Sequence, residues 1–411
     1  MATGAEESWD YSEADTQQHV HGIHIYPARM IPQIANRLIR NFSKPGDLVL
    51  DPFCGSGSVL VEALVLGRNA IGIDINPLAC LIAKVKTTPL NIEKLKSLVQ
   101  RVLENLSKKG FMNDDKIHLP AIPSASHWFK PNVLRALAII KSAIDETINK
   151  DLEQEYYDFF RVCFSMTVRR SSNIASSDNP YFIRALTGEK LRKHNPDPFK
   201  IFNEQLKEGV KRIEEFSKLI PNNVKAKVLL GDARSLPLND EEADIVVTSP
   251  PYGEESHTMS YTRFAKLSLY WLGYTSRQIK EIEKCSLGGT KFEPYSLSEF
   301  PEFIQKLYEK VRNKNKKRAT EMLYFLSDYA RSLKEIKRVL VKGGYACVVI
   351  GDRSVAGIPI PNGLITVHMG EQIGLKHMQS FTRTIPKKVL PRRDYKVELI
   401  NKENIVILKK E

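Results

Sequence analysis

The sequence predicts an α/β protein, with a sheet covered by helices on both faces and a large, mainly helical insertion. Two apolar runs carry this prediction, because each is typical of a buried strand that ends abruptly at glycine, proline or polar residues. The first run leads into the glycine-rich segment 51–58, followed by a helical pattern and a second strand at 70–74. The second run is 244–248, and it ends in Ser-Pro-Pro-Tyr at 249–252. A stretch of helical periodicity at about 90–220 separates the two runs.

The other elements follow from apolar periodicity along the chain. Helical patterns occur at 31–42, 59–64, 78–86, 92–107, 131–149, 152–168, 201–219, 261–272 and 321–341. Strand patterns occur at 46–51, 70–74, 226–232, 244–247, 345–352, 375–383 and 405–409. Gly343 and Gly344 are expected to form a turn before the strand at 345–352.

The length of 411 residues suits one large α/β domain with an insertion, or two domains. We expect residues 1–90 to form the first half of the core, and residues 91–222 to form a helical insertion that recognises substrate. Residues 223–411 are expected to complete the core, with a charged insertion at about 276–320. The scattered cysteines and the lack of a secretory signal or a run of ~20 apolar residues predict a cytoplasmic protein without a membrane span, associated with the nucleoid or with ribosomes.

The glycine-rich loop has the residue types that a bound nucleoside requires. Gly55 and Gly57 let the backbone approach a ligand closely, and Asp74 at the tip of the second strand offers a carboxylate to ribose hydroxyls. The loop lacks the Gly-x-Gly-x-x-Gly spacing of dinucleotide sites and the Gly-Lys-Ser/Thr of phosphate-binding loops. A dinucleotide or a nucleoside triphosphate is therefore the weaker interpretation.

The tetrad Ser249-Pro250-Pro251-Tyr252 carries groups that suit a planar amino group. Two consecutive prolines cannot continue a strand ladder, so the chain leaves the sheet in a stiff extended turn. The serine hydroxyl and the proline carbonyls offer acceptors to amino hydrogens, and the tyrosine offers a flat face for a base. Taken alone, the tetrad is equally compatible with a simple turn at a strand end.

Three motifs in this order resemble the S-adenosylmethionine-dependent amino methyltransferases that modify exocyclic nitrogens of nucleic-acid bases. They are Asp-Pro-Phe-Cys-Gly-Ser-Gly at 51–57, Gly-Ile-Asp at 72–74 and Ser-Pro-Pro-Tyr at 249–252. The segment His-Ile-Tyr-Pro-Ala at 24–28 is similar to the motif that precedes the first strand in many of these enzymes. The resemblance implies a Rossmann-like methyltransferase sheet and S-adenosyl-L-methionine as the cofactor.

The resemblance also assigns candidate site residues. The cofactor would contact Tyr26, Pro27, Asp51, Phe53, Gly55, Gly57, Asp74 and Asp232. The target base would contact the catalytic residues Ser249, Pro250, Pro251 and Tyr252. Serine at the first position of the tetrad is commoner in enzymes that modify N4 of cytosine, and aspartate is commoner in those that modify N6 of adenine.

We therefore expect methylation of cytosine N4 at specific sites in DNA, either beside a restriction enzyme or alone. The alternatives are N4 of cytidine in an RNA such as ribosomal RNA, and N6 of adenine. A non-catalytic nucleic-acid-binding protein with a relic fold is disfavoured, because both halves of the motif set are intact.

The distribution of charge favours a nucleic-acid partner. The net charge is +13, and neutralised phosphates dominate non-specific affinity for nucleic acid. The six cations at 310–318 form either a solvated surface or a contact surface. A second basic run at 383–396 is interrupted by prolines, so we expect a loop that contacts the backbone of nucleic acid. Its members include Arg383, Lys387, Lys388, Arg392 and Arg393.

Two further clusters have less specific patterns. Arg169 and Arg170 are candidates to bind phosphate or a guanine edge and Asn173 to read a base, with capping of a helix end as an equal alternative for this segment. His19 and His21 would share one face of an extended segment and could hold a cation. No carboxylate or cysteine is clustered with them in the sequence, so we predict no metal site.

Overall fold

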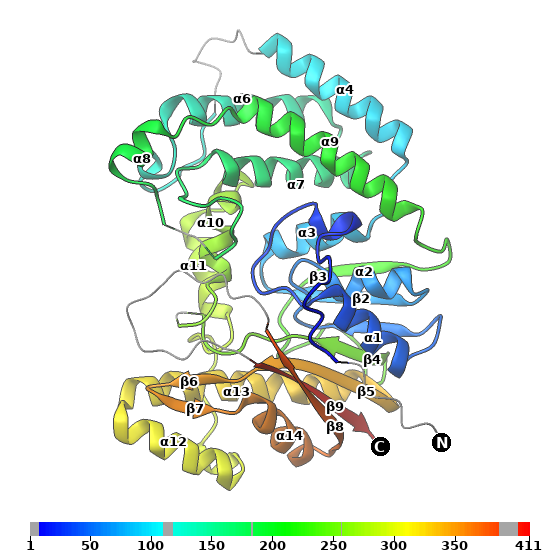
Figure 1. Ribbon diagram of the computed structural model, residues 1–411, viewed down its shortest axis with the longest axis vertical. Coiled ribbons are helices and arrows are strands. Elements are labelled where there is room, and N and C mark those ends of the chain that lie inside the picture. The colour runs from blue at the N-terminus through cyan, green and yellow to red at the C-terminus, as the bar shows by residue number, and fades with distance from the viewer. Residues whose placement is uncertain (1–7, 110–117, 182–183, 256, 386–401) are drawn as a thin grey trace.

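The computed structural model describes residues 8–109, 118–181, 184–255, 257–385 and 402–411 (Figure 1). Its centre is a seven-stranded sheet with the order β3-β2-β1-β4-β5-β9-β8. These strands are β1 (Leu48–Asp51), β2 (Asn69–Asp74), β3 (Ala226–Leu230), β4 (Ala243–Thr248), β5 (Leu340–Gly351), β8 (Leu375–Thr384) and β9 (Lys402–Lys410). Neighbouring strands from β3 to β5 are parallel, and β9 is antiparallel to both β5 and β8.

Helices account for most of the remaining described chain. They are α1 (Pro32–Phe42), α2 (Ser58–Val65), α3 (Pro77–Thr87), α4 (Ile92–Lys109), α5 (Ala125–Trp128), α6 (Pro131–Thr147), α7 (Gln154–Ser171), α8 (Gly188–Lys193), α9 (Pro198–Ser217), α10 (Tyr261–Trp271), α11 (Ser276–Cys285), α12 (Glu302–Lys314), α13 (Lys316–Val339) and α14 (Asn362–Gln372). Short 3-10 helices span His19–Gly22 and Leu297–Glu299, and a separate hairpin pairs β6 (Arg353–Val355) with β7 (Ile358–Ile360).

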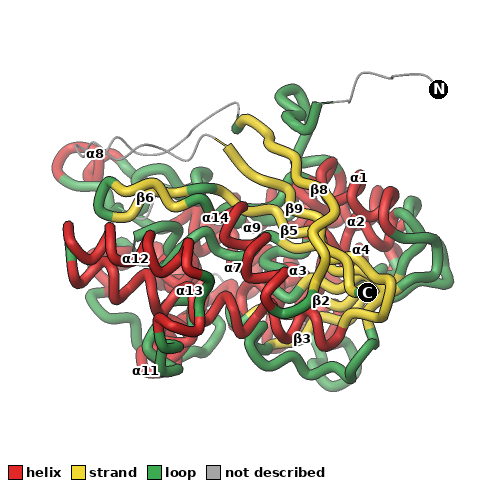
Figure 2. The backbone as a smooth tube through the Cα atoms, turned by 90° about the horizontal axis from the view of Figure 1, so that it is seen from below, coloured by secondary structure: helices red, strands yellow, loops and turns green. Residues whose placement is uncertain are grey.

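Helices cover both faces of the sheet, which confirms the predicted α/β class. Val49 and Ile245 pack on one face with α1 and α2, and Leu50 and Val246 pack on the other face with α13 and α14. Figure 2 shows these two helix pairs on opposite sides of the strands. Burial on both faces explains why the central strands are continuously apolar, since successive side chains point to opposite faces.

The segment between β2 and β3 forms a second, helical core. Within its described residues there is no strand, and α4, α6, α7 and α9 lie together beyond one end of the sheet (Figure 1). Phe159, Phe160 and Phe202 are fully buried there. Trp271 of α10 packs into the same core, so a helix from the second half of the chain joins it.

Three local expectations differ from the structure. The charged segment at 276–320 forms α11, α12 and the start of α13, and α12 buries one apolar side against α13. Gly343 and Gly344 lie inside β5 rather than before it, where the ladder with β4 shifts register and Gly343 adopts a φ of 80°. The short β6–β7 hairpin and α14 have no counterpart among the predicted elements.

The strand order positions a binding site. The chain runs from β1 to β2 on one side and from β4 to β5 on the other, so β1 and β4 flank the point where the order reverses. In open parallel sheets, ligands bind outside the carboxyl ends of the strands at this point. Both motif loops follow directly from these two strands. No helix in the described part of the chain is long and apolar enough to span a bilayer.

Candidate active site

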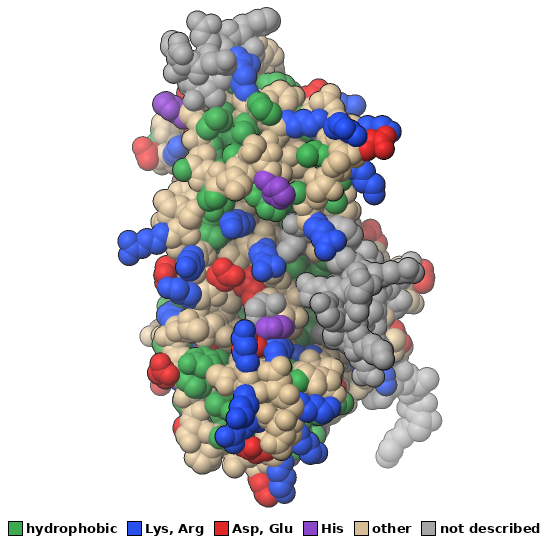
Figure 3. Space-filling view, turned by 90° about the vertical axis from the view of Figure 1, so that its left-hand side faces the viewer, with side chains coloured by type: hydrophobic (Ala, Val, Ile, Leu, Met, Phe, Trp, Pro, Cys, Tyr) green, Lys and Arg blue, Asp and Glu red, His purple; other side chains and the backbone are tan. Residues whose placement is uncertain are grey.

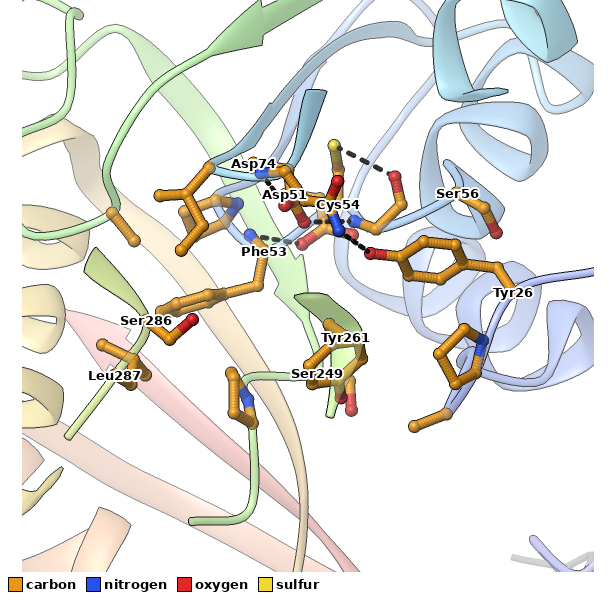
Figure 4. Close-up of a pocket in the computed structure, with 18 of the residues that line it drawn as sticks. Tyr26, Asp51, Phe53, Cys54, Ser56, Asp74, Ser249, Tyr261, Ser286 and Leu287 are labelled. Atoms are coloured by element: carbon orange, nitrogen blue, oxygen red, sulfur yellow. Dashed lines mark hydrogen bonds between the residues drawn. The ribbon is translucent and has the colours of Figure 1, made fainter. Parts of the chain in front are cut away.

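A cavity of about 1000 Å³, including its open mouth, lies at the carboxyl ends of β1, β2 and β4. Predicted site residues that line it are Tyr26, Pro27, Asp51, Phe53, Gly55, Asp74, Asp232, Ser249 and Pro251. Figure 4 shows the cavity with Ser249 and Tyr261 below Asp51 and Asp74 in that view. The fold thus brings together residues from the two motif loops, nearly two hundred positions apart in the sequence. Gly57, Pro250 and Tyr252 are not part of the lining.

Asp51 ties the first strand to the fourth. Its Oδ1 accepts a hydrogen bond from the Thr248 hydroxyl at 2.7 Å and from the Phe53 amide at 3.1 Å. Burial raises the pKa of Asp51 to about 7. These bonds hold the glycine-rich loop against the strand that leads into Ser-Pro-Pro-Tyr, so both loops have a fixed separation.

Asp74 closes the glycine-rich loop from the other side. Its Oδ2 accepts from the Gly55 amide at 2.9 Å, and its Oδ1 accepts from the Asn76 amide at 2.8 Å. Burial raises the pKa of Asp74 to about 6. Each oxygen makes one backbone hydrogen bond here, so lone pairs remain to accept from ribose hydroxyls. These acceptor oxygens therefore fit the ribose hydroxyls of an adenosyl group.

The two glycines of the loop have different roles. Gly55 has a φ of 48° and lines the cavity, and a Cβ there would lie 3.4 Å from the Tyr26 ring. Gly57 has a φ of 83°, and a Cβ there would lie 3.0 Å from Cβ of Ala83 on α3. In this structure Gly57 therefore permits close packing of α2 on α3, whereas its predicted contact with the cofactor is not seen at the cavity wall.

Flat aromatic side chains form part of the lining. Tyr26 faces Tyr261 with ring centroids 6.1 Å apart and an interplanar angle of 25°. The Tyr26 hydroxyl accepts from the side-chain amide nitrogen of Asn76 at 3.3 Å, which connects the N-terminal segment to the start of α3. Phe53 also lines the cavity. Tyr261 begins α10 and was not among the predicted site residues.

Asp232 lines the cavity but is already paired. Its two oxygens accept from Nε and Nη2 of Arg234, each at 2.8 Å, and Oδ2 also accepts from Lys291 at 3.0 Å. The Arg234 hydrogen bonds outweigh burial and lower the pKa of Asp232. Binding of an adenine amino group here would therefore compete with Lys291.

The Ser-Pro-Pro-Tyr loop is held in place by polar contacts on β9 and α14. The Tyr252 hydroxyl donates to Oε1 of Glu403 on β9 at 2.7 Å, and it lies 3.4 Å from the Ser249 hydroxyl. Asn362 at the start of α14 donates to the Tyr252 carbonyl at 2.9 Å and to the Gly351 carbonyl at 2.8 Å. Tyr252 is partly buried against the core formed with α13 and α14 and is not among the residues that line the cavity.

Two acids just beyond the tetrad, the buried Glu254 and the partly buried Glu255, were missed by sequence reasoning. Glu255 lines the cavity and accepts from the Thr262 amide and hydroxyl and from the hydroxyls of Ser260 and Ser286. Burial raises the pKa of Glu255. Its partners fix the catalytic loop to the start of α10. Two adjacent glutamates after a glycine have no distinctive pattern, so only the fold reveals this connection.

Glu254 forms a second anchor on the opposite side. Its carboxylate lies 2.5 Å from Nη1 of Arg353 and 2.7 Å from Nη2 of Arg318. Arg318 is the last cation of the basic run at 310–318, so that run is not uniformly solvated. A Cβ at Gly253 would lie 2.1 Å from Nη1 of Arg353, so a larger residue there would displace the guanidinium from Glu254.

The predicted nucleic-acid contacts fall into three groups. Arg169 is 3% exposed, and its guanidinium donates to the carbonyls of Ser177 and Asn179, both at 2.8 Å. Its predicted contact with nucleic acid is thus corrected in favour of a structural role for this segment, because the side chain braces a loop. Arg170 is partly exposed and pairs with Asp178 at 2.8 Å, where phosphate could replace the carboxylate.

The remaining contacts were expected on the basic run at 383–396. Arg383 lies in β8, is 3% exposed and pairs with Glu403, so it does not belong to a solvent-facing loop. Lys387, Lys388, Arg392 and Arg393 lie outside the described residues. Asn173 is also buried, and its amide donates to the His127 carbonyl at 3.1 Å, which replaces its expected role in reading a base.

The N-terminal histidines also differ from expectation. His19–Gly22 form a 3-10 helix, and Glu62 from α2 places Oε1 2.8 Å from Nε2 of His21. A carboxylate is thus clustered with the histidines, contrary to the sequence argument. Its other oxygen accepts from Asn36 at 2.7 Å. Burial, together with the nearby Lys86, holds the pKa of His21 well below its usual value. His19, His21 and Glu62 place possible ligand atoms within 4.8 Å of one another, so the prediction of no metal site stays a prediction.

Comparison with known proteins gives consistent matches. The DNA methylase family of N6 and N4 methyltransferases matches residues 3–85. The Type II methyltransferase M.MvaI of Kocuria varians is 31% identical over 418 residues, which covers 97% of this chain and 91% of that protein. The Type II methyltransferase M.MjaII of Methanocaldococcus jannaschii is 26% identical over 348 residues, which covers 62% and 64% of the two chains.

Among solved structures, a TehB-like S-adenosylmethionine-dependent methyltransferase from Corynebacterium glutamicum matches at a TM-score of 0.30 and 10% identity. The match covers 92% of this chain and 87% of that chain.

Proposed function

Because this chain belongs to the family of S-adenosylmethionine-dependent DNA amino methyltransferases, we propose that it methylates N4 of cytosine in DNA. S-adenosyl-L-methionine is the cofactor, and an amino group of a DNA base is the methyl acceptor. The observation that carries the choice of cytosine is Ser249 at the cavity wall, where an aspartate would favour adenine N6. The Type II relatives support a role beside a restriction enzyme.

The protein activates a weak nucleophile by hydrogen bonding. The lone pair of an exocyclic amine is delocalised into the ring, so the free base reacts slowly. If an amino hydrogen binds the Ser249 hydroxyl oxygen at the cavity wall, the nitrogen becomes more tetrahedral and its lone pair points toward the cavity. The Pro250 carbonyl, the second predicted acceptor, is not at the cavity wall in this structure. The bound cofactor supplies an electrophilic methyl group. No covalent bond between protein and base is required.

The other side of the cavity would hold the cofactor. Asp74 would accept hydrogen bonds from the ribose hydroxyls, because its carboxylate has spare lone pairs at the tip of β2. Phe53, Tyr26 and Gly55 line this part of the cavity and would contact the cofactor. Asp51 holds this half of the site at a fixed distance from Ser249 through its bond to Thr248. The two reacting groups therefore meet in a preformed geometry.

The helical core is the proposed recognition module. A base within a duplex is out of reach of a cavity this deep, so the target must leave its stack. The face of the molecule in Figure 3 carries many Lys and Arg side chains, both on the helical part and on the opposite end. Such a surface neutralises phosphates on either side of an extruded base. Arg170, at the end of α7, is one candidate contact.

A methyl-transfer assay tests this function. We expect labelled S-adenosylmethionine to label unmethylated duplex DNA in a form that DNase releases and RNase does not. Ser249→Ala should lower kcat about 10- to 100-fold while cofactor affinity is retained, since one transition-state hydrogen bond is lost. Ser332→Ala is the matched control, because Ser332 is a buried serine on α13 whose hydroxyl donates to the Asp328 carbonyl and does not line the cavity.

Two results would contradict the proposal. Label that only RNase removes would move the activity to cytidine in RNA. Full activity of Ser249→Ala would exclude the acceptor role of the serine.

A further inference from the structure

A row of interacting polar side chains lies behind the Ser-Pro-Pro-Tyr loop. It consists of Arg383, Glu403, Tyr252 and Ser249, and we call it the orienting chain. Gly351 of β5 pairs with Glu403 of β9, which pairs with Arg383 of β8, so the three lie side by side near the carboxyl end of β5. Nε of Arg383 lies 3.3 Å from Oε2 of Glu403. The other oxygen of Glu403 accepts from the Tyr252 hydroxyl at 2.7 Å. The last member of the orienting chain is Ser249, whose hydroxyl oxygen lies 3.4 Å from the Tyr252 hydroxyl oxygen.

Arg383 and Glu403 form an ion pair, and chemistry fixes the direction of the two hydrogen bonds beyond it. A carboxylate only accepts. Tyr252 has one hydroxyl hydrogen, and it is committed to Glu403, so the Tyr252 oxygen can only accept from Ser249. The hydroxyl hydrogen of Ser249 then points back toward Tyr252, and the lone pairs of its oxygen are free on the cavity side.

We propose that Glu403 and Tyr252 are positioning residues that orient the Ser249 hydroxyl as an acceptor for the amino group of the target base. This inference rests on the function proposed above. It gives Tyr252 a role other than stacking. Because its hydroxyl hydrogen is bonded to Glu403, its oxygen accepts the hydroxyl hydrogen of Ser249. Arg383 holds Glu403 in place from the far side and is itself 3% exposed.

The need for such orientation is specific to serine. An aspartate at this position would accept in every orientation, whereas a serine hydroxyl can either donate or accept. A serine whose hydrogen pointed into the cavity would oppose the amino hydrogens of the base. Asn362 supports the same arrangement, because its side chain fixes the Tyr252 carbonyl to that of Gly351, next to Glu403.

The test uses variants that keep size but alter polarity. Tyr252→Phe removes the hydroxyl and keeps the ring. Glu403→Gln replaces one acceptor oxygen by an amide NH2. The amide oxygen should stay beside Arg383, so the NH2 faces Tyr252. The NH2 then donates to the Tyr252 oxygen, which reverses the direction of the hydrogen bonds between residues 403, 252 and 249. We expect each change to lower kcat on DNA about tenfold, the effect of one hydrogen bond, while KM for DNA and Kd for S-adenosylmethionine stay unchanged.

A double-mutant cycle separates positioning from general damage. In a Ser249→Ala background, Tyr252→Phe and Glu403→Gln should cause no further loss, because they act through the missing hydroxyl. Tyr329→Phe is the matched control, since it removes another buried tyrosine hydroxyl, one that bonds Thr366, and should leave kcat unchanged. Circular dichroism melting of each variant confirms that it is folded.

The outcomes distinguish the two proposals. Suppose that Ser249→Ala lowers kcat and that adding Tyr252→Phe or Glu403→Gln lowers kcat further. The proposal that these residues act through Ser249 is then overturned, whereas the acceptor role of Ser249 stands. Unchanged kcat in both Tyr252→Phe and Glu403→Gln also overturns it. If Tyr252→Phe does not fold, the Glu403→Gln arm decides alone. Full activity of Ser249→Ala overturns the proposed function and the orienting chain together.

Discussion

Asp74 has a fixed position and a carboxyl pKa that is raised above its usual value. Both of its oxygens accept backbone amides, from Gly55 and Asn76, yet burial raises its pKa to about 6. Protonation is therefore within reach of mildly acidic buffers. A protonated carboxyl group is a weaker acceptor for ribose hydroxyls than a carboxylate.

The affinity for S-adenosylmethionine should therefore depend on pH. We expect Kd, measured by isothermal titration calorimetry, to rise as the pH falls from about 8 to about 5, with a midpoint near the pKa of Asp74 of about 6. The sign follows because the bound state favours the ionised form. Asp74→Asn should bind more weakly at pH 8 and lose this pH dependence. A wild-type Kd that is constant across this range would exclude the role of the carboxylate.

Single residues also show where sequence reasoning stops. The positions of Ser249 and Asp74 were predictable, because a polar residue that ends a buried apolar run lies at the carboxyl end of its strand. Arg169 was not, because the same arginine can face solvent or brace a loop, and only the fold shows it buried. Glu403 and Glu62 gained their partners from strands and helices far away in the sequence, and no local pattern indicates such pairings.

At the scale of elements, close packing of α2 on α3 places the glycine-rich loop. Gly57 caps α2 in the left-handed region, and its Cα faces Ala83 of α3. The loop is therefore set by helix packing as much as by its own sequence. The strands and long helices were predictable from their apolar patterns, whereas β6 and β7 were not, since three residues carry too little periodicity.

Gly57→Ala tests this packing. We expect it to lower the free energy of unfolding by about 1 to 3 kcal/mol, because it adds both left-handed strain and a contact of 3.0 Å with Ala83. Gly273→Ala is the matched control, since Gly273 has a φ of 95° but no neighbour within 4 Å of a Cβ, and should cost about 1 kcal/mol. Urea unfolding compares the two, and equal losses would contradict the packing argument.

At the scale of the whole molecule, the site joins three separate parts of the chain. The N-terminal segment contributes Tyr26, the first strands contribute Asp51 and Asp74, and the second half of the chain contributes Ser249 and Tyr261. The helical core between β2 and β3 packs against α10, which begins at the cavity with Tyr261. The helical core therefore reaches the cavity through α10.

The central claim is the identity of the methylated atom, and mass spectrometry of the product nucleosides tests it most directly. Unmethylated duplex DNA is incubated with the full chain and S-adenosylmethionine, digested to nucleosides and compared with standards, with Ser249→Ala as the matched reaction. The account predicts N4-methyl-2′-deoxycytidine, formed by the wild type and strongly reduced in the variant. N6-methyl-2′-deoxyadenosine as the product would contradict it.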